Sequence, residues 1–186
     1  MKHIGTKRME TEHLILRPFS DEDESAMYKN WASDPEVTRF LTWPTHESVE
    51  ISSMVLADWT SHYGEDHYYQ WAIELKGLGQ PIGSVAAFNL NEQVSRAEVG
   101  YCIGRPWWHQ GIMTEVLDAI ISYLIDEVGL NRVEAYHDVR NPHSGDVMRK
   151  CGMQYEGTQR SAGINNLGIC DLCWYGILAS DRRKQR

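Results

Sequence analysis

Seven short stretches of the chain have the apolar runs, or the alternation of apolar and polar residues, expected of strands. Alternation with a period of two turns one side of a strand toward a core and the other toward solvent. Turn-forming residues separate the stretches, as Gly77 and Gly79 do after the second one. The stretches are His13–Pro18, Tyr69–Lys76, Pro81–Leu90, Arg96–Gly104, Arg132–Asp138, about Met153 to Ser161, and Ile169–Leu178.

The strongest helical pattern lies between Ile112 and Val128, where apolar residues recur on one helix face and acidic residues occupy the other. Gly129 is expected to end this helix. The resulting order of elements, β, α, α, β, β, β, α, β, α, β, β, predicts one mixed α/β domain over residues 1–186 with a strand–helix–strand crossover at its centre. The three other expected helices run from Ser20 to about Ser33, from Ser48 to His62 and from Asn141 to Lys150.

The balance of acidic and basic residues limits the kinds of molecule that the protein is expected to bind. The chain carries 26 acidic and 18 basic residues, a formal net charge of −8. Binding to nucleic acid or to an anionic membrane normally needs a basic excess, so we expect neither partner. An acidic surface favours cationic partners such as amines. No stretch is long and apolar enough for a membrane span or a secretory signal, and we expect a cytoplasmic protein.

Cysteine and histidine are not spaced as metal ligands. Cys170 and Cys173 form a CxxC pair, but Cys102 and Cys151 supply no second pair. The eight histidines include neither an HExxH motif nor two residues at the i, i+4 spacing of zinc enzymes. We therefore expect no metal, and we expect the cysteines to be ordinary reduced thiols.

The connection between Gly104 and Gly111 is the most informative segment on physical grounds. It joins the end of a strand to the start of the long helix. A helix N-terminus offers free amides to an anion, and a glycine lets the backbone approach closely. The segment has neither the Lys-Ser/Thr of a P-loop nor the GxGxxG of a dinucleotide turn. It is a candidate phosphate-binding turn, with a plain strand-to-helix connection as the alternative.

The residues of this turn resemble the acetyl-CoA-binding signature (Q/R)xxGxG/A of the GNAT N-acetyltransferases. The signature appears here as WHQGIMTE, in which Trp108 replaces Gln or Arg and Met113, expected to crowd the site, replaces the last Gly or Ala. The WxxGxxTE form, NPHS at 141–144, KCGM at 150–153 and the opening EHLILRP at 12–18 are similar to the RimJ/RimL-like branch, which acetylates ribosomal-protein N-termini. The resemblance covers nearly the whole chain. It implies the GNAT fold, with about seven mixed strands flanked by about four helices.

The resemblance also implies that acetyl-CoA is the acetyl donor. Its pyrophosphate is expected on the amides of the turn, and its pantetheine arm along the backbone of the preceding strand. The residues expected to contact it are Val99, Tyr101, Ile103, His109, Gln110, Gly111, Ile112, Met113, Thr114, Asn141 and Ser144.

Two residues are candidates for the chemistry. Acetyl transfer needs a neutral amine and a stabilised thiolate leaving group. Some GNAT enzymes carry a catalytic Glu at the strand position of Glu98, and the RimJ/RimL-like branch carries a serine donor at the position of Ser144. The resemblance thus implies Glu98 as base and Ser144 as donor to the thiolate. A solvated strand carboxylate and a helix-start hydroxyl are the alternatives.

The expected function is acetyl-CoA-dependent N-acetylation of a primary amine, such as a protein N-terminus, by direct attack in a ternary complex. Acetylation of a small amine (a polyamine, an amino acid or an antibiotic) and a non-catalytic acyl-CoA-binding module are the alternatives. Segments 31–53 and 158–171 are expected to shape the acceptor pocket. Trp31, Trp43 and Trp71 either line that pocket or pack in the core. The sequence is compatible with a monomer or a homodimer.

Overall fold

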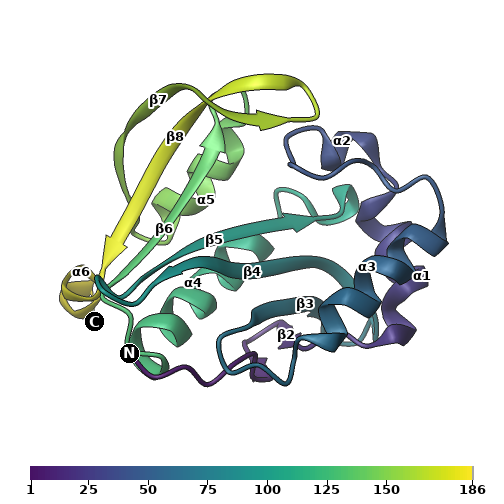
Figure 1. The fold of residues 1–186 in the computed structure, drawn as a ribbon, viewed down its shortest axis with the longest axis horizontal. Helices are drawn as coiled ribbons and strands as arrows, with labels where there is room; N and C mark the ends of the chain where they lie inside the picture. The colour runs from purple at the N-terminus through teal and green to yellow at the C-terminus, as the bar shows by residue number, and fades with distance from the viewer. Residues whose placement is uncertain (186) are drawn as a thin grey trace.

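The computed structural model describes residues 1–185. One eight-stranded sheet runs through the molecule in the order β1-β2-β3-β4-β5-β6-β8-β7 (Figure 1). Neighbouring strands are antiparallel except β5 and β6, which are parallel because helix α4 connects them. The sheet thus contains the strand–helix–strand crossover that the sequence predicts. In the part of the chain that the structure describes, no helix combines the length and apolar character needed to cross a membrane.

The strands are β1 (Met9–Glu10), β2 (Leu14–Arg17), β3 (Tyr69–Leu75), β4 (Pro81–Asn91), β5 (Arg96–Ile103), β6 (Arg132–Asp138), β7 (Gln154–Asn165) and β8 (Gly168–Leu178). The α-helices are α1 (Glu24–Met27), α2 (Pro35–Thr38), α3 (Val49–Ser61), α4 (Ile112–Ser122), α5 (Pro142–Lys150) and α6 (Ala179–Gln185). Four short 3₁₀ or π turns extend or precede them: η1 (Asp21–Asp23), η2 (Tyr28–Ala32), η3 (Arg105–Trp107) and η4 (Tyr123–Glu127).

The predicted fold class and order of elements are confirmed. The strand expected at Arg132–Asp138 has those bounds in β6, and the strongest helical pattern forms α4 followed directly by η4. The structure has eight strands where about seven were expected, because it adds the two-residue strand β1. It also adds the helices α2 and α6, which were not expected. β1 and α2, with two and four residues, are too short to show a hydrophobic period, and α6 is polar apart from its first residue.

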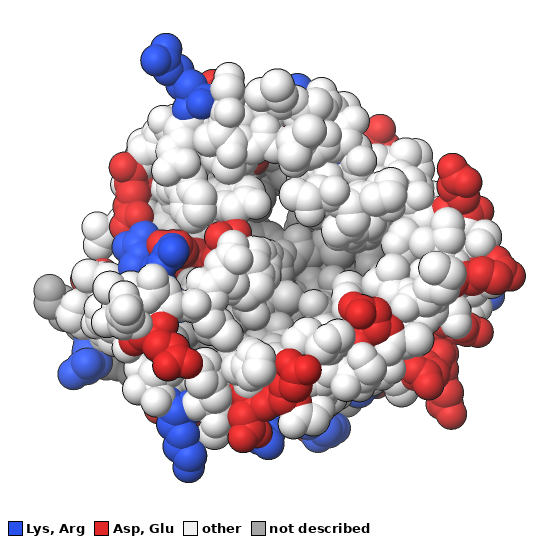
Figure 2. All heavy atoms as spheres, viewed as in Figure 1, with Lys and Arg blue, Asp and Glu red and all other residues white. Residues whose placement is uncertain are grey.

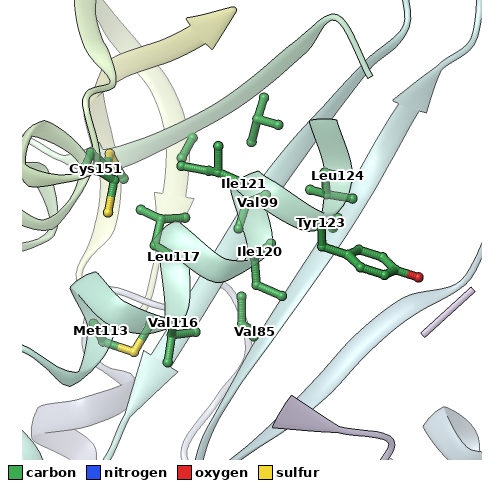
Figure 3. Close-up of a cluster of buried hydrophobic side chains, with 14 of the residues drawn as sticks. Val85, Val99, Met113, Val116, Leu117, Ile120, Ile121, Tyr123, Leu124 and Cys151 are labelled. Carbon is green, nitrogen blue, oxygen red and sulfur yellow. The ribbon is translucent and has the colours of Figure 1, made fainter. Parts of the chain in front are cut away.

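Helix α4 forms the larger core on one face of the sheet. Its buried residues are Ile112, Met113, Val116, Leu117, Ile120 and Ile121. They join one cluster with Val85 of β4 and Val99 of β5 (Figure 3). This packing fixes where the N-terminus of α4 lies relative to the end of β5.

Helices α1 and α3 contribute to a second core on the opposite face. Phe19, Trp31 and Leu56 are buried there against Ala72 of β3. Trp31 and Trp71 are fully buried in the second and the larger core, respectively. Core packing is therefore the correct alternative for these two tryptophans, whereas Trp43 is only partly buried at the edge of the second core.

Candidate active site

Strands β5 and β6 pair over only three residues and then separate. The paired positions are Arg96 with Arg132, Ala97 with Val133, and Glu98 with Glu134. Beyond Glu98, β6 continues to pair with β8 and β5 with β4, so the two halves of the sheet diverge (Figure 1). The edge of β5 from Val99 to Ile103 has no strand partner on this side among residues 1–185. Its free main-chain groups are available to a ligand, and the surface is hollowed at this place (Figure 2).

The candidate phosphate-binding turn follows the end of β5, beyond the point where β5 and β6 separate. No residue within 1–185 accepts a hydrogen bond from the main-chain amides of residues 109–113, and Gly111 caps α4 without a side-chain hydrogen bond. The backbone of His109 (φ 59°) and Gly111 (φ 80°) is left-handed, which shapes the turn. A Cβ at Gly111 would meet no other atom within 4 Å. The turn therefore presents a row of unoccupied donors at a helix N-terminus, the arrangement that suits a phosphate group.

The two departures from the family signature have structural explanations. The indole Nε1 of Trp108 donates to the carbonyl of Ile103 at 2.7 Å and so fastens the turn to the end of β5. The side chain of Met113 is 8% exposed and points into the core beneath α4 (Figure 3). The expectation that Met113 crowds the site is therefore wrong, because its side chain leaves the exposed amides free.

Glu98 lies at the last position where β5 pairs with β6, and it is only 5% exposed. The Nδ2 of Asn89 donates to Glu98 Oε2 at 3.1 Å. Burial raises the pKa of Glu98 above its ordinary value, although the Asn89 hydrogen bond and the charge of Arg96 act in the opposite direction. A buried carboxylate with a raised pKa is a stronger base than a solvated one, so the geometry fits proton abstraction.

Asn89 is a residue that the sequence analysis missed. It sits in a β-bulge of β4 with a φ of 49°, a conformation that asparagine tolerates better than most residues. The bulge interrupts the ladder between β4 and β5 and brings the amide to Glu98. The only signal in the sequence is an asparagine inside a strand pattern, where it is disfavoured.

Ser144 lies in the first turn of α5, across the divergence from β5. Its Oγ is 3.0 Å from the hydroxyl of Tyr101, and its amide donates to the carbonyl of Asn141. Asn141 precedes Pro142 at the N-terminus of α5, and its side chain makes no capping hydrogen bond. Successive side chains of β5 alternate between the faces of the sheet, so Glu98 and Tyr101 lie on opposite faces. The divergence therefore has Glu98 on one face and Ser144 on the other.

A network of charged side chains borders a cavity near Glu98. Glu134, in register with Glu98, forms ion pairs with Arg96 and Arg132, and Arg132 also pairs with Glu156. The cavity has a volume of about 500 Å³. It is lined by Arg96, Arg132, Glu134, Glu156, Gly157, Thr158, Gln159 and Trp174. Two arginines thus neutralise Glu134, whereas Glu98 has an amide as its direct partner.

The β7–β8 hairpin closes the outer side of the hollow by contacting the segment between α2 and α3. The Nδ2 of Asn166 donates to the carbonyls of Thr38 and Trp43 at 2.9 Å and 2.8 Å. The Nδ2 of Asn165 donates to Asp138 at the end of β6 at 2.6 Å. We call these contacts the asparagine clasp, and those of Asn166 bring together the two segments expected to shape the acceptor pocket. Neither asparagine was singled out from the sequence.

The remaining cysteine and histidine side chains are dispersed. All four cysteines are free thiols. Within residues 1–185, no three His, Cys, Asp or Glu side chains come together as potential metal ligands. His109 and His143 do meet, edge to face at 4.9 Å between ring centroids, beside the candidate phosphate turn.

Comparison with known proteins places this geometry in a family. Residues 13–154 match the acetyltransferase (GNAT) domain. The chain is 32% identical over 170 residues to the uncharacterized N-acetyltransferase YoaA of Bacillus subtilis, covering 91% of this chain and 96% of that protein. It is 26% identical to the [ribosomal protein uS5]-alanine N-acetyltransferase of Escherichia coli, covering 83% of this chain and 82% of that protein. Among solved structures, RimL, a ribosomal-protein α-N-acetyltransferase in complex with coenzyme A, has the same fold, with a TM-score of 0.82 at 18% identity over 92% of this chain and 98% of that chain.

The family match spans most of the chain, including β5, the turn and α4. GNAT enzymes use acetyl-CoA and acetylate amines. The protein therefore belongs to the GNAT family and is an N-acetyltransferase.

Proposed function

We propose that the enzyme transfers the acetyl group of acetyl-CoA to the α-amino group of a protein N-terminus by direct attack in a ternary complex. The observation that carries this proposal is the divergence of β5 and β6, which has Glu98 on one face and Ser144 on the other. An acceptor amine and a thioester approaching from opposite faces would meet there without a covalent enzyme intermediate.

The donor side fits acetyl-CoA through main-chain groups. The free amides from His109 to Met113 suit the pyrophosphate, whereas the amide of Thr114 donates to the carbonyl of Gly111. The open edge of β5 at Val99 and Tyr101, together with the amide of Ile103, suits the amides of the pantetheine arm, while the Ile103 carbonyl already accepts from Trp108. Asn141 is the N-cap of α5 and its side chain makes no capping hydrogen bond, so its amide is available for a polar contact with acetyl-CoA.

The chemistry then follows from the two faces. The amine nitrogen forms a bond to the acetyl carbon, and the carbon–sulfur bond breaks with its electron pair going to sulfur. Glu98, made more basic by burial, removes the proton that the attacking nitrogen loses. The Ser144 hydroxyl donates a hydrogen bond to the developing thiolate.

The choice of acceptor is supported by charge and by similarity. The net charge of −8 suits a cationic acceptor. A relative that matches most of the chain is the [ribosomal protein uS5]-alanine N-acetyltransferase of Escherichia coli. The deciding experiment measures thiol release from acetyl-CoA with peptides bearing free N-termini, alongside polyamines, amino acids and aminoglycosides. We expect turnover with the peptides; turnover with a small amine alone would assign the enzyme to that acceptor class, and no turnover with any amine would contradict the proposal.

The first prediction concerns the phosphate turn. Gly111→Asp places a carboxylate beside the expected pyrophosphate, where repulsion at about 4 Å costs roughly 1 kcal/mol in water and several times more where water is excluded. Calorimetry should show acetyl-CoA affinity reduced by about tenfold or more. Gly111→Asn is the matched control, since it has the same shape without the charge and also tolerates the left-handed φ of 80°. Equal affinities for the two variants would show that the pyrophosphate does not bind at this turn.

The second prediction concerns Ser144. Ser144→Ala should lower kcat by about 10- to 1000-fold, the range for losing one donor to a developing anion. Acetyl-CoA affinity should change little, because the sulfur of a thioester accepts hydrogen bonds weakly. Ser61→Ala, which removes an exposed serine hydroxyl at the end of α3, should keep the wild-type kcat. A wild-type kcat for Ser144→Ala would show that the hydroxyl does not stabilise the thiolate and has only a structural role at the start of α5.

The third prediction concerns Glu98 and pH. A base must be deprotonated to act, and the pKa of Glu98 is raised, so wild-type kcat/KM should rise with pH through that raised value. Glu98→Gln keeps the shape but cannot accept the proton. Its kcat/KM should be depressed most at low pH and partly rescued above about pH 8, where an α-amino group of pKa about 7.7–8.0 is deprotonated by solvent. Glu156→Gln, which changes a carboxylate lining the neighbouring cavity, is the control and should retain the wild-type profile. Parallel profiles for wild type and Glu98→Gln would exclude Glu98 as the base.

A further inference from the structure

The side chain of Tyr101 bridges the two diverging halves of the sheet. Tyr101 belongs to the part of β5 that has lost its pairing with β6, and Ser144 belongs to α5, beyond β6 in the chain. The Tyr101 hydroxyl lies 3.0 Å from Ser144 Oγ and 3.1 Å from the Ser144 carbonyl oxygen. Both of its contacts are therefore to the residue proposed to stabilise the thiolate.

The chemistry of these contacts determines what Tyr101 can do. A phenol has one proton to donate and lone pairs that accept. The Ser144 carbonyl only accepts, so in the free enzyme Tyr101 donates to the carbonyl and accepts from the Ser144 hydroxyl, or donates to Ser144 Oγ directly. Burial raises the pKa of Tyr101 well above its ordinary value, so the phenol keeps its proton at every pH at which the enzyme would work. It is a permanent neutral donor beside Ser144.

We propose that Tyr101 is a positioning residue that holds the Ser144 hydroxyl at the divergence and strengthens it as a donor. This inference rests on the proposed role of Ser144. As the carbon–sulfur bond breaks and its electron pair goes to sulfur, the Ser144 O–H turns to the sulfur and the Tyr101 O–H donates to Ser144 Oγ. A donor that itself accepts a hydrogen bond is polarised and donates more strongly. The O–H bond of Tyr101 does not break, and the proton lost by the amine goes to Glu98 on the opposite face of the sheet.

The fold supports this role because the surrounding structure fixes the position of both Tyr101 and Ser144. Tyr101 lies in the middle of β5, which β4 holds by antiparallel pairing at Val85. Gly145, which follows Ser144, is buried so closely against the His137 ring that a Cβ there would lie 2.5 Å from Nε2. Both ends of the Tyr101–Ser144 contact are thus fixed by packing, as a preorganised donor requires.

A double-mutant cycle tests the proposal. Tyr101→Phe should lower kcat by about 3- to 10-fold, the effect of one neutral hydrogen bond, with KM for acetyl-CoA changed by less than about twofold. In the Ser144→Ala background, Tyr101→Phe should cause no further decrease in kcat, because Tyr101 acts through the missing hydroxyl. The shape of the pH profile should stay that of the wild type, since neither hydroxyl titrates.

Tyr123→Phe is the matched control, because Tyr123 is a buried tyrosine of the same core whose hydroxyl donates to the carbonyl of Gly5 at 2.5 Å. It measures what loss of a buried phenol hydroxyl does to folding alone, and it should keep the wild-type kcat. Equal decreases in kcat for Tyr101→Phe in the two backgrounds, or no decrease in either, would overturn the inference while leaving N-acetylation intact. Absence of transfer by the wild type to every amine would contradict the proposed function itself.

Discussion

The early end of the pairing between β5 and β6 is the constraint on which the rest of the structure depends. After Glu98 and Glu134 the two strands share no further ladder positions. Each strand keeps its other neighbour, so the sheet becomes two arms, one built from β1 to β5 and the other from β6, β8 and β7. Unpaired main-chain groups are unfavourable once buried. At this opening α4 packs against Val99 of β5, and the unpaired edge of β5 leaves main-chain groups that water or a ligand can satisfy.

The base of the opening places two glutamates side by side in register, an arrangement that disfavours both charges. The structure resolves the conflict asymmetrically. Glu134 forms ion pairs with Arg96 and Arg132, whereas Glu98 receives one amide hydrogen bond from Asn89. Burial then raises the pKa of Glu98. Two carboxylates of the same type thus differ because their partners differ, and the one with the weaker compensation is the one suited to moving a proton.

The sequence was most informative where a hydrophobic repeat extended over several turns of helix or where the backbone conformation favoured a particular residue. The period of α4 and the turn at Gly111 were visible as residue patterns, and together they placed the candidate phosphate site. Asn89 and Tyr101 could not be assigned in the same way, because their roles arise from a bulge and from a contact across 43 residues of chain. Trp108 and Met113 looked like departures from a signature, yet the first fastens the turn and the second fills the core. Their side-chain directions follow from tertiary packing, which no local pattern contains.

The asparagine clasp shows why the acceptor side is harder to predict than the donor side. Asn166 binds the main-chain carbonyls of Thr38 and Trp43, not their side chains. A contact to main-chain carbonyls persists when the residues bearing them change, provided that the loop keeps its path. The clasp can therefore hold the hairpin over the hollow while side chains in both segments vary and reshape the pocket beneath. The proposed donor site, in contrast, uses backbone amides at a helix N-terminus, next to a backbone position with a φ of 80° that favours glycine. That preference is visible in the sequence, so a candidate phosphate-binding turn could be inferred from residue patterns and acetyl-CoA from the family resemblance, while the acceptor must be identified by assay.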